Sequence, residues 1–229
     1  MIGERNKMNW HSTTVIRIML IAGFCALSAS VSAAVAQDVV TVGTINGFSQ
    51  TLDVPVYIRD TSGTPLGIDQ PPGSKIQSYS LKVDYSPAAA VQSITFTRAG
   101  ITAGLTPTLE LSPSAPGSIS LLDRFQESSN PIPFTLNGAP PGNLVGHLVV
   151  TLNPSVTPGT VITLALDPVL TELTDEGGSG ATKETSGNGN LALVNGAINV
   201  VAVAIPAMNE WIVALLAMTL LAIGLRIRL

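Results

Sequence analysis

One histidine is the only side chain after residue 36 that could act as the base of a hydrolytic triad. The alternation around it predicts a strand that places Leu144 and Leu148 on one face. His147 then points outward, flanked by Val145 and Val149, which the same alternation also places on the outward face. The chain has no Gly-x-Ser-x-Gly motif, and after residue 36 it has no cysteine and no second histidine. The sequence therefore predicts a surface histidine and no catalytic residue.

Two pairs of carboxylates have types that suit acid/base chemistry. Asp123 with Glu127, or Asp175 with Glu176, would correspond to the two carboxyl groups that glycosidases use. Nothing in the sequence indicates a deep cleft around either pair. We interpret all four as solvated acids in loops.

Calcium is the one cofactor for which the sequence offers ligands, because loops of sandwich folds can supply the oxygen atoms that calcium prefers. Candidate ligands are Asp60, Asp69, Asp175 and Glu176, although their spacing does not match an EF-hand. We therefore expect no cofactor-binding or metal site, with calcium at these loops as the alternative.

Composition excludes a nucleic-acid surface. Charged residues make up 11% of the 229-residue chain, and its net charge is −4, whereas phosphate binding needs clustered Lys and Arg. Both tryptophans, Trp10 and Trp211, lie near the ends of the chain. The absence of tryptophan from the middle of the chain weakens the hypothesis that exposed aromatic rings there bind a sugar, although tyrosines remain.

The N-terminus has the order of a secretory signal peptide. A basic stretch ends at Arg17, an apolar run follows at residues 18–27, and small residues end in Ala34, Val35 and Ala36. Cleavage is predicted before Gln37, so that residues 1–36 are removed. A retained membrane helix is the alternative, and either Met1 or Met8 is the start.

The C-terminus has the pattern of a short membrane span. Residues 211–225 would form a helix of about 22 Å, which is short for a hydrocarbon core of about 30 Å. Arg226 and Arg228 follow it, and the positive-inside rule places residues 37–204 outside the cytoplasm.

Between these ends, the hydrophobic pattern has period two and is interrupted by turn signals about every ten residues, which predicts an all-β sandwich. Strands are expected near residues 39–45, 52–58, 79–85, 91–97, 118–122, 144–152, 162–166 and 191–203. Two polar loops, 60–74 and 174–190, are expected to be solvated and mobile. One domain, residues 37–203, accounts for this part of the chain.

The C-terminal 26 residues, 204–229, resemble the IPTL-CTERM sorting signal of Gram-negative bacteria, which joins a short motif, a transmembrane helix and a basic end. The residues that carry the resemblance are Ile205, Pro206, Ala207, Met208, Trp211, Arg226 and Arg228. Ala207 and Met208 replace the Thr and Leu of the motif. The resemblance implies an exosortase-type membrane transpeptidase as a partner. It also implies transient anchoring in the inner membrane with the domain in the periplasm, then transfer to the cell surface. An ordinary anchor is the alternative.

The middle of the chain resembles a cohesin-type module, a jelly-roll-like sandwich of about nine strands. The similar stretches are residues 52–58, 76–87, 158–164 and 194–200. Proteins of this class bind dockerin modules or polysaccharide-associated assemblies, so the resemblance implies a non-enzymatic binding or scaffold module with an unknown protein or polysaccharide partner. Carbohydrate binding is the second hypothesis, and a secreted hydrolase is the third.

Overall fold

The computed structural model describes residues 35–177, 182–202 and 218. Most of the predicted signal peptide and sorting signal lies outside these residues. Within the described part, no helix reaches the length and hydrophobicity needed to cross a membrane. Of the predicted span at residues 211–225, only Met218 is described.

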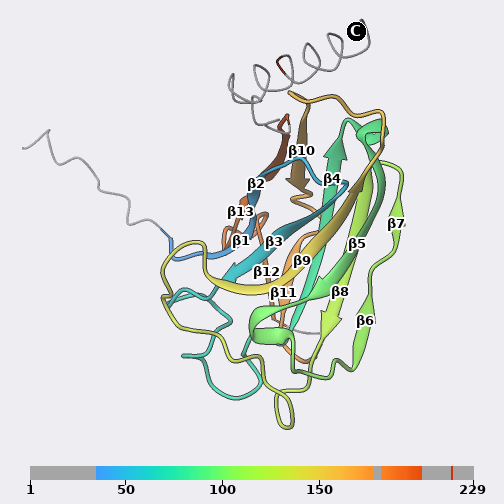
Figure 1. Ribbon diagram of the computed structural model, residues 1–229. Helices are drawn as coiled ribbons and strands as arrows, with labels where there is room; N and C mark the ends of the chain where they lie inside the picture. The colour runs from blue at the N-terminus through green and yellow to red at the C-terminus, as the bar shows by residue number, and fades with distance from the viewer. Residues whose placement is uncertain (1–34, 178–181, 203–217, 219–229) are drawn as a thin grey trace, which may run out of the picture. The chain divides into compact units, whose positions relative to one another are not determined.

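The described residues form a two-layered β-sandwich, which Figure 1 shows as two sheets lying face to face. The predicted all-β class is confirmed, but the described chain has fourteen strands where about nine were expected. In chain order they are β1 (Asp38–Val42), β2 (Thr44–Gly47), β3 (Thr51–Arg59), β4 (Ser78–Ser86), β5 (Val91–Arg98), β6 (Leu109–Leu111), β7 (Ser114–Ala115), β8 (Ser118–Arg124), β9 (Asn143–Leu152), β10 (Val161–Leu166), β11 (Glu172–Thr174), β12 (Lys183–Thr185), β13 (Leu191–Val194) and β14 (Gly196–Val200).

One sheet has five strands in the order β13-β1-β3-β9-β5. The other has nine strands. It contains the path β12-β11-β4-β10-β14-β2, with β8 beside β4 and the short β6 and β7 beside β8. Alternate side chains of each sheet point into one shared core, as in β3, where Val54, Val56 and Ile58 are fully buried. Burial of these residues is the main source of stability in a chain with no cysteine after residue 36.

The terminal strands pass from one sheet to the other, which the sequence pattern did not predict. The expected strand at 39–45 is two strands, β1 and β2, and the expected strand at 191–203 is β13 and β14. β1 pairs in parallel with β13, and β2 pairs in parallel with β14. At the crossing, a Cβ atom on Gly196 would collide with the carbonyl oxygen of Gly43. Two glycines therefore allow the two backbones to change sheets side by side.

A β-bulge changes the facing of β9 near its start. The pairing between β3 and β9 shifts register after Val56, so that Tyr57 lies opposite Leu144 and Val145 is the extra residue. Val145 is fully buried, and Leu144 is half-buried. The prediction that Val145 points outward is therefore wrong. His147 and Val149 do lie on the half-exposed side.

The two long loops are less solvated than predicted. In the loop at 60–74, Asp60 and Leu66 have no exposed surface, and Thr64 is buried. The described part of the loop at 174–190 contains β12, whose Glu184 is fully buried. Leu66 joins the main core, while the N–H group of Leu66 donates to Glu184 Oε1 at 2.8 Å. Backbone and side-chain hydrogen bonds thus hold both loops against the sandwich.

Candidate functional site

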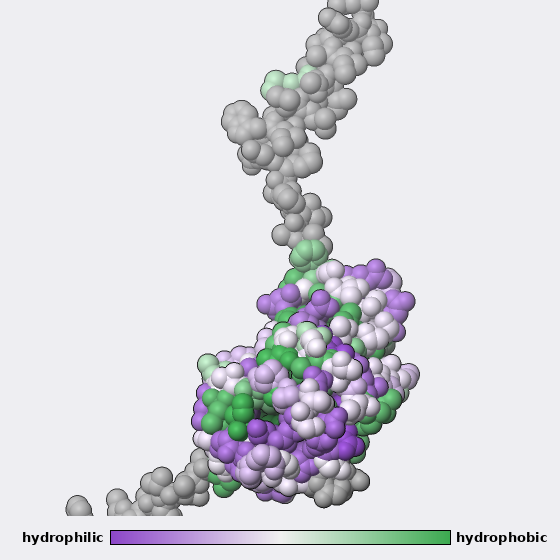
Figure 2. All heavy atoms as spheres, turned by 90° about the horizontal axis from the view of Figure 1, so that it is seen from below, coloured by the Kyte–Doolittle hydropathy of each residue, from purple (hydrophilic) through white to green (hydrophobic). Residues whose placement is uncertain are grey.

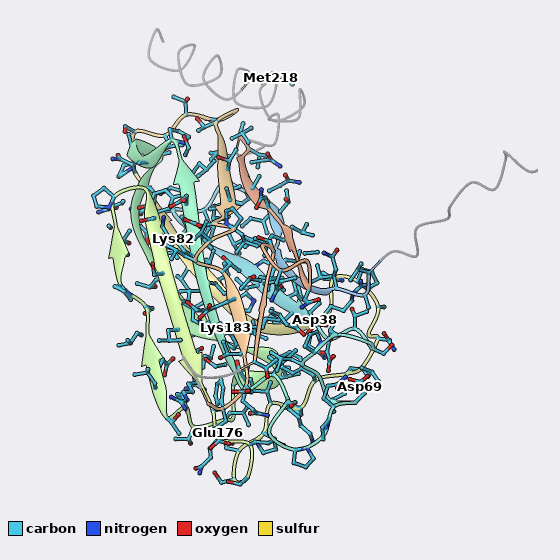
Figure 3. All side chains as sticks on the ribbon, turned by 180° about the vertical axis from the view of Figure 1, so that it is seen from behind. Asp38, Asp69, Lys82, Glu176, Lys183 and Met218 are labelled. Atoms are coloured by element: carbon cyan, nitrogen blue, oxygen red, sulfur yellow. The ribbon has the colours of Figure 1, made fainter. Side chains whose placement is uncertain are left out.

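The outer face of the nine-stranded sheet carries a mixed polar and apolar surface. Figure 3, seen from the side opposite to Figure 1, shows Lys82 and Lys183 over the strands of this sheet. The amino group of Lys82 lies 3.0 Å from a carboxylate oxygen of Asp167 and 3.4 Å from one of Asp84. Lys183 pairs with Glu172 at 2.9 Å. The side chains of these ion pairs are partly accessible to solvent.

Apolar side chains gather along the same sheet. Leu122 of β8 pairs with Leu111 of β6, and Leu109 lies two residues before Leu111 on the same face. Leu109 and Leu111 are exposed, while Leu122 is half-buried. We call Leu109, Leu111 and Leu122 the leucine edge, because all three lie on the adjacent strands β6 and β8. The face seen in Figure 2 shows how hydrophobic surface occurs in separate small groups among hydrophilic side chains.

The outer face of the five-stranded sheet contains His147. Its central row contains Pro55 of β3, His147 of β9 and Thr97 of β5, which lie opposite one another across the strands. Neither a serine nor a carboxylate lies directly opposite His147, as a hydrolytic triad would favour. His147 is half-buried on this face, as its position in the strand predicted.

Exposed aromatic side chains do not form a line on either sheet. Tyr79 and Phe125 are fully buried and pack with their ring centroids 6.4 Å apart, and Tyr85 is 8% exposed. Phe48, in the turn after β2, is 64% exposed, and Tyr57 is half-buried on the five-stranded sheet. The described residues therefore lack the row of exposed rings on which a sugar chain would stack.

A surface hollow of about 380 Å³ lies beside the N-terminal end of β6 and the C-terminal end of β8. It is lined by Thr106, Pro107, Thr108, Gln126, Ser129 and Asn130. This lining includes no acid, histidine, lysine or cysteine. The hollow thus has hydrogen-bonding groups but no group that would transfer a proton at neutral pH.

The first predicted carboxylate pair does not form an acid/base site. Asp123 is 1% exposed and accepts a hydrogen bond of 2.5 Å from the hydroxyl of Tyr79. Burial raises the pKa of Asp123 to about 6, although the hydrogen bond from Tyr79 lowers it. Glu127 lies outside the core and accepts a hydrogen bond from the N–H group of Gly73. Asp123 is thus a buried acid of the core, contrary to the prediction of a solvated loop acid.

The carboxylates of the second predicted pair, Asp175 and Glu176, accept hydrogen bonds from backbone N–H groups. The two carboxylate oxygens of Asp175 accept hydrogen bonds from the N–H groups of Gly177 and Thr182, at 2.6 and 2.9 Å. Glu176 Oε2 accepts one from the N–H group of Glu127 at 2.9 Å. Because these carboxylates already accept hydrogen bonds that hold the loop backbone in place, they are poorly placed as calcium ligands.

A second buried acidic pair was missed by the sequence analysis. Asp38 and Glu184 have no exposed surface, and neither Asp38 Oδ2 nor Glu184 Oε2 has a hydrogen-bond donor among the described residues, so that a proton held between the two carboxyl groups would satisfy both. Burial, together with Glu184, raises the pKa of Asp38 to about 9, so the pair holds a proton at neutral pH. Asp38 shares the inward period of Val40 and Val42, which was the signal available in the sequence. Glu184 gave no such signal, because its strand has three residues.

Asp60 and Asp69, two of the predicted calcium ligands, lie together. Asp60 is fully buried at the end of β3, while Asp69 is exposed. Figure 3 shows Asp69 at the same end of the sandwich as Asp38. A Cβ atom at Gly67 would lie 2.7 Å from Asp60 Oδ1 and 2.8 Å from Asp69 Oδ1. No three Asp, Glu, His or Cys side chains among the described residues are arranged to hold a metal ion by themselves.

The predicted processing residues lie mostly outside the described part. Ala34 and the sorting-signal residues at 205–208, 211, 226 and 228 fall there. Ala36 and Gln37 are described and half-buried, and Gln37 Nε2 donates to the carbonyl oxygen of Gly189 at 2.8 Å. β1 begins one residue later, at Asp38. The cleavage position itself stays a prediction.

Comparison with known proteins gives no match to a protein-family model and none to a curated protein sequence. Solved structures do match. A type I cohesin in a cohesin–dockerin complex from Clostridium thermocellum aligns with a TM-score of 0.51 and 12% identity, over 72% of this chain and 99% of that one. The third cohesin ScaC of Acetivibrio cellulolyticus gives 0.50 and 15%, over 72% and 100%. CaCohA2 of Clostridium acetobutylicum gives 0.50 and 19%, over 74% and 94%. The predicted fold is thereby confirmed: the described domain is a cohesin-type β-sandwich.

Proposed function

We propose that this chain is an exported, non-enzymatic module that binds a protein partner at the outer face of its nine-stranded sheet. The observation that carries the proposal is the leucine edge beside the Lys82 ion pairs. Apolar side chains next to accessible charges provide area to bury and polar groups to orient a partner. Two of the similar cohesins were crystallised in complex with dockerins, which supports a protein as the class of partner.

The chemistry of the surface argues against an enzyme. The described hollow has no titratable lining, His147 lacks a triad partner, and Asp123 lies in the core. A secreted hydrolase therefore stays the third hypothesis.

A partner test compares two sheet faces of the same protein. Leu111→Lys places a charge within the leucine edge, and Thr97→Lys places one on the exposed face of the other sheet. We expect the wild-type chain and the Thr97 variant to retain the same protein from culture supernatant in a pull-down, and the Leu111 variant to lose it. Retention by the Leu111 variant with loss by the Thr97 variant would move the interface to the five-stranded sheet.

Carbohydrate binding is the second candidate, favoured by the exposed ring of Phe48. Affinity electrophoresis against a panel of polysaccharides tests it. We expect no retardation of the wild-type chain. Retardation by a glycan that is abolished by Phe48→Ala or Tyr57→Ala would make carbohydrate the ligand instead.

We also propose surface attachment through the C-terminal signal. The support is the order of its three parts in the sequence: the motif at Ile205, the apolar run, and the arginines at 226 and 228. An exosortase-type transpeptidase would then be a processing partner, and the inner membrane a transient location.

A further inference from the structure

We propose that one end of the sandwich docks on the outer surface of the inner membrane while the C-terminal segment is anchored there. The docking surface, which we call the uncharged tip, consists of residues 47–50, 87–90, 116–117, 153–160 and 201–202. Its partner is the boundary between headgroups and acyl chains of a lipid bilayer, with no requirement for anionic lipid. This inference rests on the membrane anchoring proposed above.

The segments of the uncharged tip lie side by side at one end of the strands. Backbone N–H groups donate to carbonyl oxygens between them: Val201 to Gly47 at 2.9 Å, Asn153 to Ala90 at 2.9 Å and Gly159 to Val200 at 2.7 Å. A Cβ atom at Gly117 would lie 3.7 Å from the Cβ of Ala88, so this turn belongs to the same surface. The tip is at the upper end of the sandwich in Figure 1, where β4 ends and β10 begins.

Charged side chains are absent from the tip and frequent at the opposite end. The segments of the tip contain no Asp, Glu, Lys, Arg or His. Asp53 and Asp84 are the charged residues closest to it along β3 and β4, and each lies two residues inside its strand. The loops at the other end contain Asp69, Lys75 and Glu127, and Figure 2, seen from that end, shows extensive hydrophilic surface. A charge at a bilayer must lose part of its hydration, so a charge-free end is the one that can approach lipid.

Apolar side chains project from the tip. Phe48 is 64% exposed and Val201 is 40% exposed, and Val161, the first residue of β10, is 51% exposed at the border of the tip. Val169 is more exposed, but it lies two residues after Asp167 and outside the tip. An aromatic ring beside aliphatic groups suits the interface between lipid headgroups and acyl chains.

The position of the tip in the chain selects a bilayer as its partner. Ala202 is the last residue of the tip, and Trp211, where the predicted span begins, follows nine residues later. A connection of this length reaches about 32 Å at most, even when fully extended. Glu210 is the only charged residue within it. Because a short tether gives an effective concentration of about millimolar, a weak contact between the tip and the lipid is sufficient.

Docking of the tip would also orient the partner-binding face. β4 ends at the tip, and β8 and β10 begin there, so these strands run away from the membrane and their sheet would stand upright on it. The leucine edge lies toward the far end of β8. It would therefore stay in the aqueous phase, accessible to a protein partner.

Fluorescence quenching in lipid vesicles tests the docking with the full chain. Cys25→Ala removes the one cysteine, so that a bimane label can be attached at a single new thiol. Ser49→Cys places the label in the tip, and Ser128→Cys places it in the loop after β8, both at exposed positions. In phosphatidylcholine vesicles that contain a headgroup-nitroxide lipid, we expect strong quenching at residue 49 and little at residue 128. Because the tip is uncharged, about 1 M NaCl or added phosphatidylglycerol should leave this difference unchanged.

Charge substitutions make the test specific to the tip. In the chain labelled at residue 49, Phe48→Asp should lower the ratio of docked to undocked molecules about tenfold, because burial of the ring is lost and a charge would be dehydrated. Val161→Asp, on another strand, should give a smaller loss in the same direction. The matched control Val169→Asp, at an exposed apolar position outside the tip, should be quenched like the parent chain. Thermal unfolding checks that the three variants remain folded.

The outcomes separate the docking from the anchor. A chain that fails to float with vesicles in a density gradient, or that still floats without residues 211–229, would refute the proposed anchor and the docking with it. A chain that floats through these residues but is quenched equally at positions 49 and 128, or is unaffected by Phe48→Asp, would refute the docking alone. Quenching that disappears when the chain is diluted within the vesicles would show that the tip contacts a second copy instead of lipid.

Discussion

Buried acids in this sandwich obtain their hydrogen-bond partners in different ways. Asp123 accepts from the hydroxyl of Tyr79, while Asp38 and Glu184 share a proton. Both arrangements lie in the hydrophobic interior, where an ionised carboxylate loses much of its solvation. The protonation of these groups therefore sets how the stability of the domain responds to pH.

The Asp38 and Glu184 pair predicts that stability falls as pH rises. The folded protein binds the Asp38 proton more tightly than the unfolded chain does, because its pKa is raised from 3.8 to about 9. The favourable contribution is complete below pH 3.8 and is lost as pH increases to about 9, by at most about 1.4 kcal/mol per pH unit. Asp38→Asn supplies an N–H donor for Glu184 in place of the proton. Urea denaturation from pH 5 to pH 9 should show a smaller decline in this variant than in the wild type.

The hydroxyl of Tyr79 predicts a second pH effect. Tyr79→Phe leaves Asp123 without its donor, which should cost about 1–3 kcal/mol of unfolding free energy at pH 7.5. The loss should be smaller at pH 4.5, because a protonated Asp123 carries no charge to stabilise. Tyr57→Phe, on the half-exposed face, is the control and should be nearly neutral at both pH values. An equal loss at both pH values for the Tyr79 variant would contradict this account.

Among the secondary-structure elements, the terminal strands link the two layers. The chain passes from one sheet to the other between β1 and β2, and again between β13 and β14. β1 and β2 meet at Gly43, and β13 and β14 meet beside Gly196. The two backbones approach so closely that a side chain at residue 196 cannot be accommodated there.

Gly196→Ala should therefore destabilise the domain by about 1–3 kcal/mol or more, the usual range for overpacking a filled interior. Its Cβ would meet the carbonyl oxygens of Gly43 and Val42, which are backbone atoms that cannot rotate away. The matched control is Gly104→Ala, where a Cβ would have no neighbour within 4 Å. Thermal unfolding of both proteins checks the difference. Similar melting temperatures for the two variants would show that the crossing tolerates a side chain.

Period-two hydrophobicity predicted the long strands because each has one buried face, as in β3, β4 and β10. It did not predict β6, β7, β11 and β12, which have two or three residues and cannot show a period. The sheet change at Gly43 leaves the alternation nearly intact, so one strand was expected where two exist. The bulge at Val145 depends on how β9 pairs with β3, and this pairing cannot be read from the sequence of β9 alone. The convergence of Asp60 with Asp69 likewise depends on the fold of the loop.

For the whole molecule, the single hydrophobic core between the two sheets indicates a domain that folds alone. We expect residues 37–203, expressed without the ends, to give a β-type circular dichroism spectrum and a cooperative melt in the presence of chelator. A disordered spectrum that becomes folded only with calcium would contradict this prediction.

The C-terminal signal predicts cleavage during surface transfer. Pro206 disfavours helix at Ile205, so the backbone there should be extended, as protease-like enzymes require. Intact-mass analysis of protein recovered from the cell surface should show loss of everything beyond roughly residues 205–208. Pro206→Ala should leave precursor in the inner membrane. Surface protein that still carries Arg226 and Arg228 would instead indicate an ordinary anchor.

The parallel pairing of the first and last strands also determines when the domain can fold. Under the proposed export from the N-terminus, β1 and β2 would emerge first and keep an unpaired edge until β13 and β14 arrive. Unpaired edges invite aggregation, so this interval would be the one in which the exported chain is most exposed to it. Val200 ends β14 only five residues before Ile205, the start of the predicted signal. Under the proposed export, folding would thus be completed only as translocation ends.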